Sequence, residues 1–396
     1  MVPGDPLTSG GERETISMNS SVHLAFFMAS LADGGIGKMR LHLTSELVKR
    51  GIQVDLLLGR TDSPYVHRIH PEVRVIHVHT SHSIACVPGL AYYLWKHRPD
   101  VLVTERVRVN VAGLRAVNLA RARTKVFAGV HTTMSEELER LRPEKKRSHS
   151  AAMRRYYPRN DGLIAVSRGV ARDLLETLRI PAEKIHVVRN PVVTPDLVRM
   201  ADAPVDHPWL SGDGPPVILG AGRLEPQKDF PTLIRAFALL RRERPSRLVI
   251  LGKGGQRGQL HSLAEELGVA GEVSFPGFVD NPYAYMARSR LFVLSSAWEG
   301  FGNVLVEALA VGVPVVATDC PSGPREILQD GRYGALVPVG DVPALASAMA
   351  GTLASPSAGE ILKTAAEPFT AVRVAGEYLA ALGFRAPLEA RIETGD

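Results

Sequence analysis

The sequence predicts an α/β protein with two domains, each built on a parallel sheet with helices on its faces. Short apolar runs alternate with longer amphipathic stretches, as they do when strands alternate with crossover helices. The chain has 396 residues, of which 45% are hydrophobic. This length exceeds that of most domains built around a single hydrophobic core. A proline-rich stretch at 196–216 has little periodicity, so we interpret it as the linker between the two domains.

The first half of the chain, residues 21–195, is predicted to form one domain after a disordered extension at 1–20. Its expected strands lie at 23–30, 53–58, 73–77, 100–104, 125–130, 162–166 and 184–188. Gly34 and Gly35 follow the first strand and precede a helix, which is the opening unit of a nucleotide-binding α/β domain. The loop is not a Walker A motif, because Met39 follows Lys38 where Ser or Thr would hold magnesium.

The second half, residues 217–368, is predicted to form the other domain, with a final helix and tail at 369–396. Its expected strands lie at 217–222, 247–251, 274–279, 291–294 and 313–319. The strand at 291–294 leads into a glycine-rich turn and a short apolar helix, with Asn303 as the expected N-cap. Glu299 and Glu307 flank the start of this helix, and carboxylates there suit pairs of sugar hydroxyls.

Two cations follow the first strand of the second half. Arg223 comes directly after Gly222, and Lys228 lies five positions further on. A planar guanidinium can hold two phosphate oxygens, while an ammonium acts as a compact positive charge. We therefore expect a diphosphate to bind at the end of this strand.

The charge balance and the cysteine count limit the class of protein. Lys and Arg exceed Asp and Glu by 47 to 41, and the two cysteines, Cys86 and Cys320, lie in different halves. A disulfide framework is therefore not expected, and a reducing cytoplasm is the simplest location. The sequence contains neither the apolar core of a signal peptide nor an apolar run of the ~18 residues that a membrane span needs.

A basic segment at 140–159 carries eight Lys and Arg residues and a single acid, Glu144. Such a segment is either a solvated helix or a contact with anionic lipid. Tyr92 and Trp95 offer a second interfacial contact, although packing against the sheet explains them equally well.

Over roughly residues 22–382 the chain resembles the GT-B nucleotide-sugar glycosyltransferases, particularly the retaining enzymes of family 4. The resemblance rests on the E-x7-E pattern of Glu299 and Glu307, on G-R-L-x-x-Q-K-D at 222–229, on the Gly34–Gly35 loop and on His131 after the strand at 125–130. It implies two Rossmann-like domains that face each other across a cleft, with the donor held mainly by the second domain.

The resemblance also implies the roles of single residues. The implied catalytic residues are His131, Glu299, Arg223 and Lys228. The implied donor-binding residues are Gly34, Gly35, Arg223, Lys228, Gly254, Gly277, Phe278, Phe301, Gly302, Asn303 and Glu307. Family members transfer the sugar with retention and without an essential metal, so no metal and no cofactor beyond the nucleotide-sugar is expected.

The expected function is transfer of a hexose from a UDP- or GDP-sugar to a glycan or lipid-linked acceptor in exopolysaccharide or lipopolysaccharide biosynthesis, in the cytoplasm at the inner face of the membrane. Alternatives are a soluble small-molecule acceptor, a GT-B phosphorylase or sugar-nucleotide epimerase, and a non-catalytic nucleotide-sugar binding protein. A basic nucleic-acid-binding module is the alternative from another class; its binding would fall steeply with salt, and no nucleic-acid partner is expected.

Overall fold

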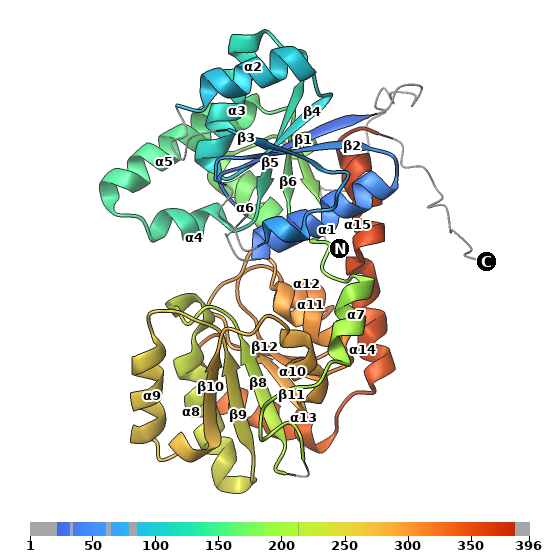
Figure 1. Cartoon of the computed structure of the whole chain (residues 1–396). Helices are drawn as coiled ribbons and strands as arrows, with labels where there is room; N and C mark the ends of the chain where they lie inside the picture. Colours follow the sequence, from blue (N-terminus) through green and yellow to red (C-terminus); the bar gives the residue numbers. More distant parts are fainter. Residues whose placement is uncertain (1–21, 32–34, 61–64, 79–84, 213, 385–396) are drawn as a thin grey trace, which may run out of the picture. The chain divides into compact units, whose positions relative to one another are not determined.

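The computed structural model describes residues 22–31, 35–60, 65–78, 85–212 and 214–384 (Figure 1). The chain divides into two compact units. The first unit comprises the residues up to Pro191 together with those from Ala371 onward, and the second unit comprises Val192–Thr370. The C-terminal part of the chain thus returns to the unit that the N-terminal part forms.

The first unit is organised around a seven-stranded parallel sheet in the order β3-β2-β1-β4-β5-β6-β7. Its strands are β1 (His23–Met28), β2 (Gln53–Leu58), β3 (Arg74–His77), β4 (Val101–Glu105), β5 (Lys125–Val130), β6 (Gly162–Ala165) and β7 (Ile185–Val187). Its helices are α1 (Gly35–Lys49), α2 (Val87–His97), α3 (Val107–Ala120), α4 (Met134–Glu139), α5 (Pro143–Tyr156), α6 (Arg168–Leu178) and α15 (Ala371–Ala381).

Both faces of the central strands β1, β4 and β6 are buried, which explains their largely apolar sequences. Successive side chains of β1 alternate between two clusters. Leu24 and Phe26 pack in one cluster with residues of α1 and α15, and Ala25 and Phe27 pack in the other with residues of α2 and α3. Helices therefore cover the sheet on both sides (Figure 1).

The second unit repeats this plan with a six-stranded parallel sheet in the order β10-β9-β8-β11-β12-β13. Its strands are β8 (Val217–Ala221), β9 (Arg247–Leu251), β10 (Val273–Gly277), β11 (Leu291–Leu294), β12 (Val315–Thr318) and β13 (Ala335–Val337). Its helices are α7 (Pro195–Ala201), α8 (Phe230–Glu243), α9 (Arg257–Glu266), α10 (Pro282–Arg288), α11 (Asn303–Ala310), α12 (Pro324–Ile327), α13 (Val342–Ala354) and α14 (Gly359–Ala366).

The order of the strands reverses once in each sheet, between β1 and β4 in the first unit and between β8 and β11 in the second. In open parallel sheets ligands bind outside the carboxyl ends of the strands at such a reversal. The loops that follow β1 and β4, and those that follow β8 and β11, are therefore the places to look for a site.

The predicted α/β fold with two Rossmann-like domains is confirmed. The sequence analysis does not predict β13, which has only three residues. It also places Asn303 at the N-cap of the helix after β11, and this is wrong. Gly302 occupies the N-cap with φ of 98°, a conformation that glycine adopts easily, and Asn303 is the first helical residue.

The stretch expected as a linker, 196–216, belongs to the second unit. Pro195 starts α7, because proline suits the first turn of a helix, and Thr194 caps that turn. The helix packs against α10. The expected extension at 1–20 and the tail after 384 lie outside the described residues.

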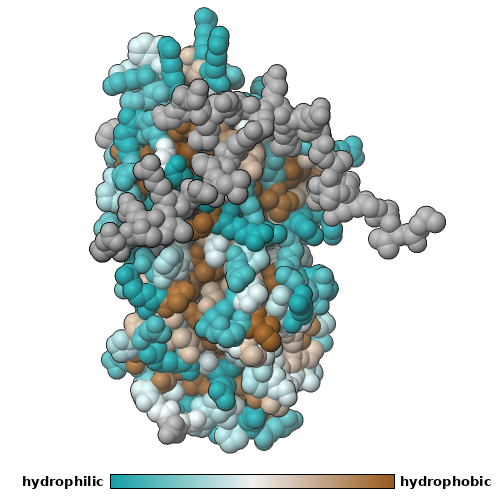
Figure 2. All heavy atoms as spheres, turned by 90° about the vertical axis from the view of Figure 1, so that its right-hand side faces the viewer, coloured by the Kyte–Doolittle hydropathy of each residue, from teal (hydrophilic) through white to brown (hydrophobic). Residues whose placement is uncertain are grey.

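Hydrophobic residues are interspersed with hydrophilic ones on the face drawn in Figure 2. Among the helices that the structure describes, none is both long enough and apolar enough to cross a bilayer. The exposed aromatic side chains include Tyr92 and Trp95 of α2, which are 59% and 60% exposed. Their rings lie 6.1 Å apart, so they form one aromatic surface that packing within the unit does not explain.

Candidate functional site

In the second unit, an ion pair joins the loops that follow β8 and β11, the two strands at the reversal. Lys228 ends the short helix Pro226–Lys228, and its Nζ donates to Oε1 of Glu299. Ser296 Oγ donates to the same oxygen at 2.7 Å. The Lys228 and Glu299 side chains are 13% and 8% exposed, so the pair is largely desolvated. An ammonium carries three donors, so Lys228 keeps donors for an anion after pairing with Glu299.

Arg223 lies in the same loop, but its side chain is 65% exposed. Its Nη2 donates to Gln227 Oε1 at 3.1 Å, and its Nη1 lies 3.1 Å from Glu225 Oε2. Gln227 in turn donates to the carbonyl of Trp298 at 3.1 Å and so ties the loop after β8 to the loop after β11. Exposed ion pairs are weak, so the Arg223 guanidinium can turn toward a phosphate.

The absence of a side chain at Gly222 leaves space for the Lys228 side chain. A Cβ on Gly222 would lie 2.9 to 3.0 Å from three side-chain carbons of Lys228. The lysine stem therefore passes directly over this backbone. Packing against Lys228 thus explains why glycine occupies the first position of the G-R-L-x-x-Q-K-D pattern.

Glu307 lies in the middle of α11, beyond its first turn, and is 4% exposed. Tyr283 from α10 donates its hydroxyl to Glu307 Oε1 at 3.5 Å. The Phe301 side chain is also buried, edge-on against Phe369 at 5.4 Å between ring centroids. Because the Phe301 ring is buried, only the backbone of this residue can contact a ligand.

The remaining residues predicted in this unit follow the neighbouring strands. Gly254 lies in the loop after β9, and a Cβ there would collide with backbone atoms of Leu224. Gly277 ends β10 with φ of 90° and accepts a hydrogen bond from the Gly252 N–H at 2.8 Å. Phe278, 52% exposed, offers its ring next to Lys253, with Nζ 5.4 Å from the ring centroid. Since the strands are parallel, these positions share one edge of the sheet with Lys228 and Glu299.

In the first unit, three side chains form a hydrogen-bonded network at the carboxyl ends of β4 and β5. Arg40 of α1 donates through Nη2 to Glu105 Oε1, and His131 Nε2 is hydrogen-bonded to Glu105 Oε2. The Arg40 and Glu105 side chains are 4% and 3% exposed, whereas His131 is 16% exposed. The imidazole is therefore the member of this network that a substrate can reach.

Burial lowers the pKa of His131 to about 3, and the positive charges of Arg40 and Arg106 act in the same direction. A neighbouring carboxylate normally raises the pKa of a histidine. Here Arg40 compensates the charge of Glu105, so little negative field remains at the ring. The imidazole is neutral at pH 7, and its contact with Glu105 is a hydrogen bond rather than an ion pair.

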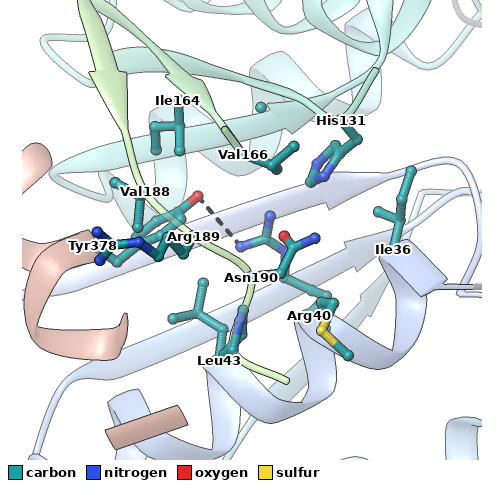
Figure 3. Close-up of a pocket in the computed structure, with 13 residues that line it drawn as sticks. Ile36, Arg40, Leu43, His131, Ile164, Val166, Val188, Arg189, Asn190 and Tyr378 are labelled. Carbon is teal, nitrogen blue, oxygen red and sulfur yellow. Dashed lines mark hydrogen bonds between the residues drawn. The ribbon is translucent and has the colours of Figure 1, made fainter. Parts of the chain in front are cut away.

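Arg40 and His131 border a pocket in the first unit (Figure 3). In Figure 3 the Arg40 guanidinium lies between His131 and Tyr378, and the Tyr378 hydroxyl is its hydrogen-bond partner at 3.3 Å. Ile36, Leu43 and other apolar side chains line it together with Arg189 and Asn190. The pocket thus combines an apolar wall with a few polar groups, as ligand sites do.

Of the other residues predicted in the first unit, Gly34 lies outside the described residues, and Gly35 is the first residue of α1. Sequence reasoning missed Arg40 and Glu105. Glu105 had a detectable signal, because it is a charged residue at the end of the buried strand β4. Its register opposite Gly129 of the neighbouring strand places it beside His131. In the described ranges no group of three or more His, Cys, Asp or Glu side chains is arranged to hold a metal ion.

Comparison with known families agrees with this two-part architecture. Residues 33–195 match the family model described as Glycosyltransferase Family 4. Residues 206–368 match the model described as Glycosyl transferases group 1. The two matches fall on the first and the second unit, respectively.

Among curated proteins, the chain is 37% identical over 183 residues to the N-acetylgalactosamine-N,N'-diacetylbacillosaminyl-diphospho-undecaprenol 4-alpha-N-acetylgalactosaminyltransferase of Campylobacter jejuni, covering 46% of this chain and 48% of that protein. It is 36% identical over 195 residues to the lipopolysaccharide core biosynthesis glycosyltransferase LpsE of Rhizobium meliloti, covering 49% of this chain and 54% of that protein. The chain therefore spans about half the length of these two relatives.

Among solved structures, HepE of Anabaena in complex with UDP and glucose superposes with a TM-score of 0.73 at 21% identity, covering 91% of this chain and 99% of that one. The apo form of the lipopolysaccharide outer core galactosyltransferase WaaB superposes with a TM-score of 0.68 at 21% identity, with the same coverage of 91% and 99%. At these identities the likeness shows the fold.

Proposed function

The chain belongs to the GT-B glycosyltransferases, and on this basis we propose that it transfers a hexose from a UDP- or GDP-sugar to a glycan or lipid-linked acceptor with retention of configuration. The observation that carries the proposal is the Lys228–Glu299 pair at the strand reversal of the second unit, with Arg223 in the same loop. Cations and carboxylates at one edge of a sheet suit a ligand that has both phosphates and hydroxyls.

The proposed division of roles follows the chemistry of each group. Lys228 and Arg223 neutralise the diphosphate, whose leaving oxygen gains negative charge as the bond to the sugar breaks. Glu307, buried in the middle of α11, accepts hydrogen bonds from the ribose hydroxyls. Glu299 and the backbone of 301–303 position the sugar, and the carboxyl-end loops at Gly254, Gly277 and Phe278 border the nucleotide. Gly34, Gly35 and His131 are proposed to contact substrate from the first unit.

We propose that retention arises on one face of the sugar. The C1–O bond to the diphosphate breaks, and its electron pair goes to the phosphate oxygen. The acceptor hydroxyl oxygen bonds to C1 on the same side and gives its proton to that oxygen. A proton NMR spectrum of the glycosidic product would show an anomeric coupling matching the donor. The opposite anomer would exclude retention.

The donor class is open to a direct test. A thermal-shift panel of UDP-, GDP- and ADP-sugars, each with EDTA and with Mg²⁺, should give a shift with one nucleotide class and no dependence on the metal. A ligand at a hundred times its dissociation constant stabilises a protein by about 2.7 kcal/mol. The same panel on Lys228→Ala should lose the shift. A shift that survives in this variant would contradict the proposed site, and a shift that needs Mg²⁺ would contradict metal independence.

For a lipid-linked acceptor we further propose that α5 and α2 contact an anionic membrane. All eight Lys and Arg side chains at 140–159 are exposed, and Met153 is the buried residue of α5. Helix α2, with the exposed Tyr92 and Trp95, packs on α3, which also packs on α5. Each Lys or Arg near an anionic surface contributes about 1 kcal/mol. The two curated relatives named above concern an undecaprenol-linked substrate and lipopolysaccharide core biosynthesis.

Flotation with liposomes tests this surface. The protein should float with anionic vesicles and not with neutral ones, and changing Lys145, Lys146 and Arg147 to Glu should abolish flotation. A matched control changes the exposed Arg235, Arg242 and Arg290 of the second unit to Glu, which alters net charge equally. Equal loss in both variants, or no flotation of the unmodified protein, would contradict the membrane contact and favour a soluble acceptor.

The principal alternative is a protein that binds a nucleotide-sugar without transferring it. Both readings use the Lys228–Glu299 site, so ligand binding cannot separate them. Release of free nucleoside diphosphate that depends on an added acceptor supports transfer. Binding without any release, across acceptors from simple glycosides to lipid-linked glycans, would support the binding protein.

A further inference from the structure

Binding of the nucleotide-sugar donor does not by itself explain the hydrogen-bonded network of Arg40, Glu105 and His131. We infer that Glu105 is a positioning residue that holds the proton of the His131 imidazole on Nε2, so that Nδ1 accepts a hydrogen bond from a substrate hydroxyl. The placement of the proton rests on geometry within the first unit. Its importance for turnover rests on the proposed sugar transfer.

The imidazole of His131 is the donor in its hydrogen bond with Glu105. A guanidinium is always positively charged and has no acceptor. Arg40 donates to Oε1 of Glu105, which favours the ionised carboxylate. An ionised carboxylate can only accept, so the bond between Oε2 and His131 must carry the proton of the imidazole Nε2. In a neutral ring Nδ1 is then the acceptor.

Several side chains of the first unit hold the Arg40 guanidinium in place. The Arg40 guanidinium lies 4.4 Å from the centroid of the Phe26 ring and 5.6 Å from that of Tyr378, and it also donates to the Tyr378 hydroxyl at 3.3 Å. It is thus fixed by β1 and α15 while it holds Glu105 at the end of β4. Three elements of the unit therefore set the position of one carboxylate, as the outer partner of a working histidine requires.

Gly129 supplies an independent observation. It lies within β5, where the backbone is extended and glycine is not needed for its conformation. A Cβ at this position would lie 2.5 Å from Glu105 Oε2 and 3.1 Å from His131 Nε2. The missing side chain is what allows the carboxylate and the ring to meet, so the sequence of β5 accommodates this contact.

Glu105 and His131 differ in their access to the pocket. The Glu105 carboxylate is 3% exposed and faces groups of the protein, whereas the ring that it holds is 16% exposed and borders the pocket of Figure 3. A substrate hydroxyl can therefore contact the ring but not the carboxylate. Glu105 acts through His131, and it is a positioning residue rather than a catalytic one.

The direct test reads the tautomer. The full-length protein, labelled with ¹⁵N in its histidines, is recorded at pH 7 beside His131→Gln, which identifies the His131 signals among the 13 histidines. We expect a protonated Nε2 and an unprotonated Nδ1. A proton on Nδ1, or on both nitrogens, would overturn the inference. This measurement needs no substrate and stands even if sugar transfer is not found.

The functional test uses Glu105→Gln. Arg40 will hold the amide oxygen, so the amide NH₂ faces His131 and forces the proton onto Nδ1. We expect the tautomer to switch and kcat to fall about 100-fold, with the donor KM unchanged. Glu46→Gln is the matched control, because Glu46 is a buried acid of the same unit whose ion pair is with Lys49. A variant that keeps the Nε2 proton and full kcat would overturn the inference. Should Glu105→Gln not fold, the tautomer of the unmodified protein decides.

Discussion

The two units place a cation and a glutamate at the same topological position. In the first unit Arg40, on the helix after β1, pairs with Glu105 at the end of β4. In the second unit Lys228, in the loop after β8, pairs with Glu299 in the loop after β11. Each pair therefore bridges the two strands at which the strand order of its sheet reverses.

The pairs differ in the cation and in what surrounds it. Arg40 and Glu105 are closed off, at 4% and 3% exposure, and their charges compensate each other beside a neutral imidazole. Lys228 and Glu299 are more open, at 13% and 8%, and the exposed Arg223 adds a second cation. A rigid guanidinium suits permanent positioning, whereas an ammonium with spare donors suits an incoming anion. We propose that the first pair orients a side chain and that the second binds a ligand.

The largest effect that separates the pairs is expected from Lys228→Ala. The variant leaves Glu299 buried without its cation and removes the charge that we propose to stabilise the leaving phosphate, so kcat/KM should fall about 10³-fold. Lys363→Ala, which removes an exposed lysine paired with Glu360 on α14, is the control and should change kcat/KM little. Steady-state kinetics measure both. A loss below tenfold would mean that the second unit does not hold the diphosphate here.

The counterpart in the first unit is Gly129→Ala. The added methyl displaces Glu105 from His131, and we expect kcat to fall about 100-fold while donor binding by thermal shift is kept. Gly89→Ala on α2 is the control, since a Cβ there meets only Val78 at 4.0 Å. Equal loss of donor binding and of kcat in Gly129→Ala would show that the two units do not divide the roles in this way.

The depressed pKa of His131 predicts a pH-dependent stability. The unfolded chain binds a proton at this residue below about pH 6.5, while the folded ring stays neutral until about pH 3. The stabilisation is thus complete above pH 6.5 and is lost as the pH falls. Between pH 7 and 5 the free energy of unfolding should drop about 2 kcal/mol more than in His131→Gln.

Urea unfolding at the two pH values measures this difference. His67→Gln replaces an exposed histidine of the same unit and should follow the unmodified protein. Parallel losses in the unmodified protein and in His131→Gln would mean that the ring is not kept neutral by burial. The Arg40–Glu105 pair could then not be described as a closed pair beside a neutral imidazole.

The smallest effect is expected at Glu307. If its carboxylate binds the ribose, Glu307→Gln should weaken binding of the nucleoside diphosphate about tenfold. The preference for this nucleotide over its 2′-deoxy form should also shrink. Calorimetric titration of both nucleotides measures it, with the exposed Glu265→Gln of α9 as control. An unchanged preference would place the ribose elsewhere.

Much of the site in the second unit was predictable because its residues are close in sequence to the strands that position them. Arg223 and Lys228 follow β8 directly, and Glu299 follows β11. Glycine turns mark these loops, and parallel strands bring their carboxyl ends to one edge. The N-cap at Gly302 was missed because sequence favours a polar side chain at that position, while glycine satisfies the same geometry through its backbone.

The sequence by itself determined the alternation of strands and helices, the two sheets and the cations after β8, since all of these depend on local hydrophobic pattern and turn chemistry. Only the tertiary structure decided that Arg40, Glu105 and His131 meet, because they come from α1, β4 and the end of β5. It also decided that Phe301 belongs to the core and that the imidazole is neutral. Burial and the compensation of charges depend on contacts between distant residues, which no local pattern records.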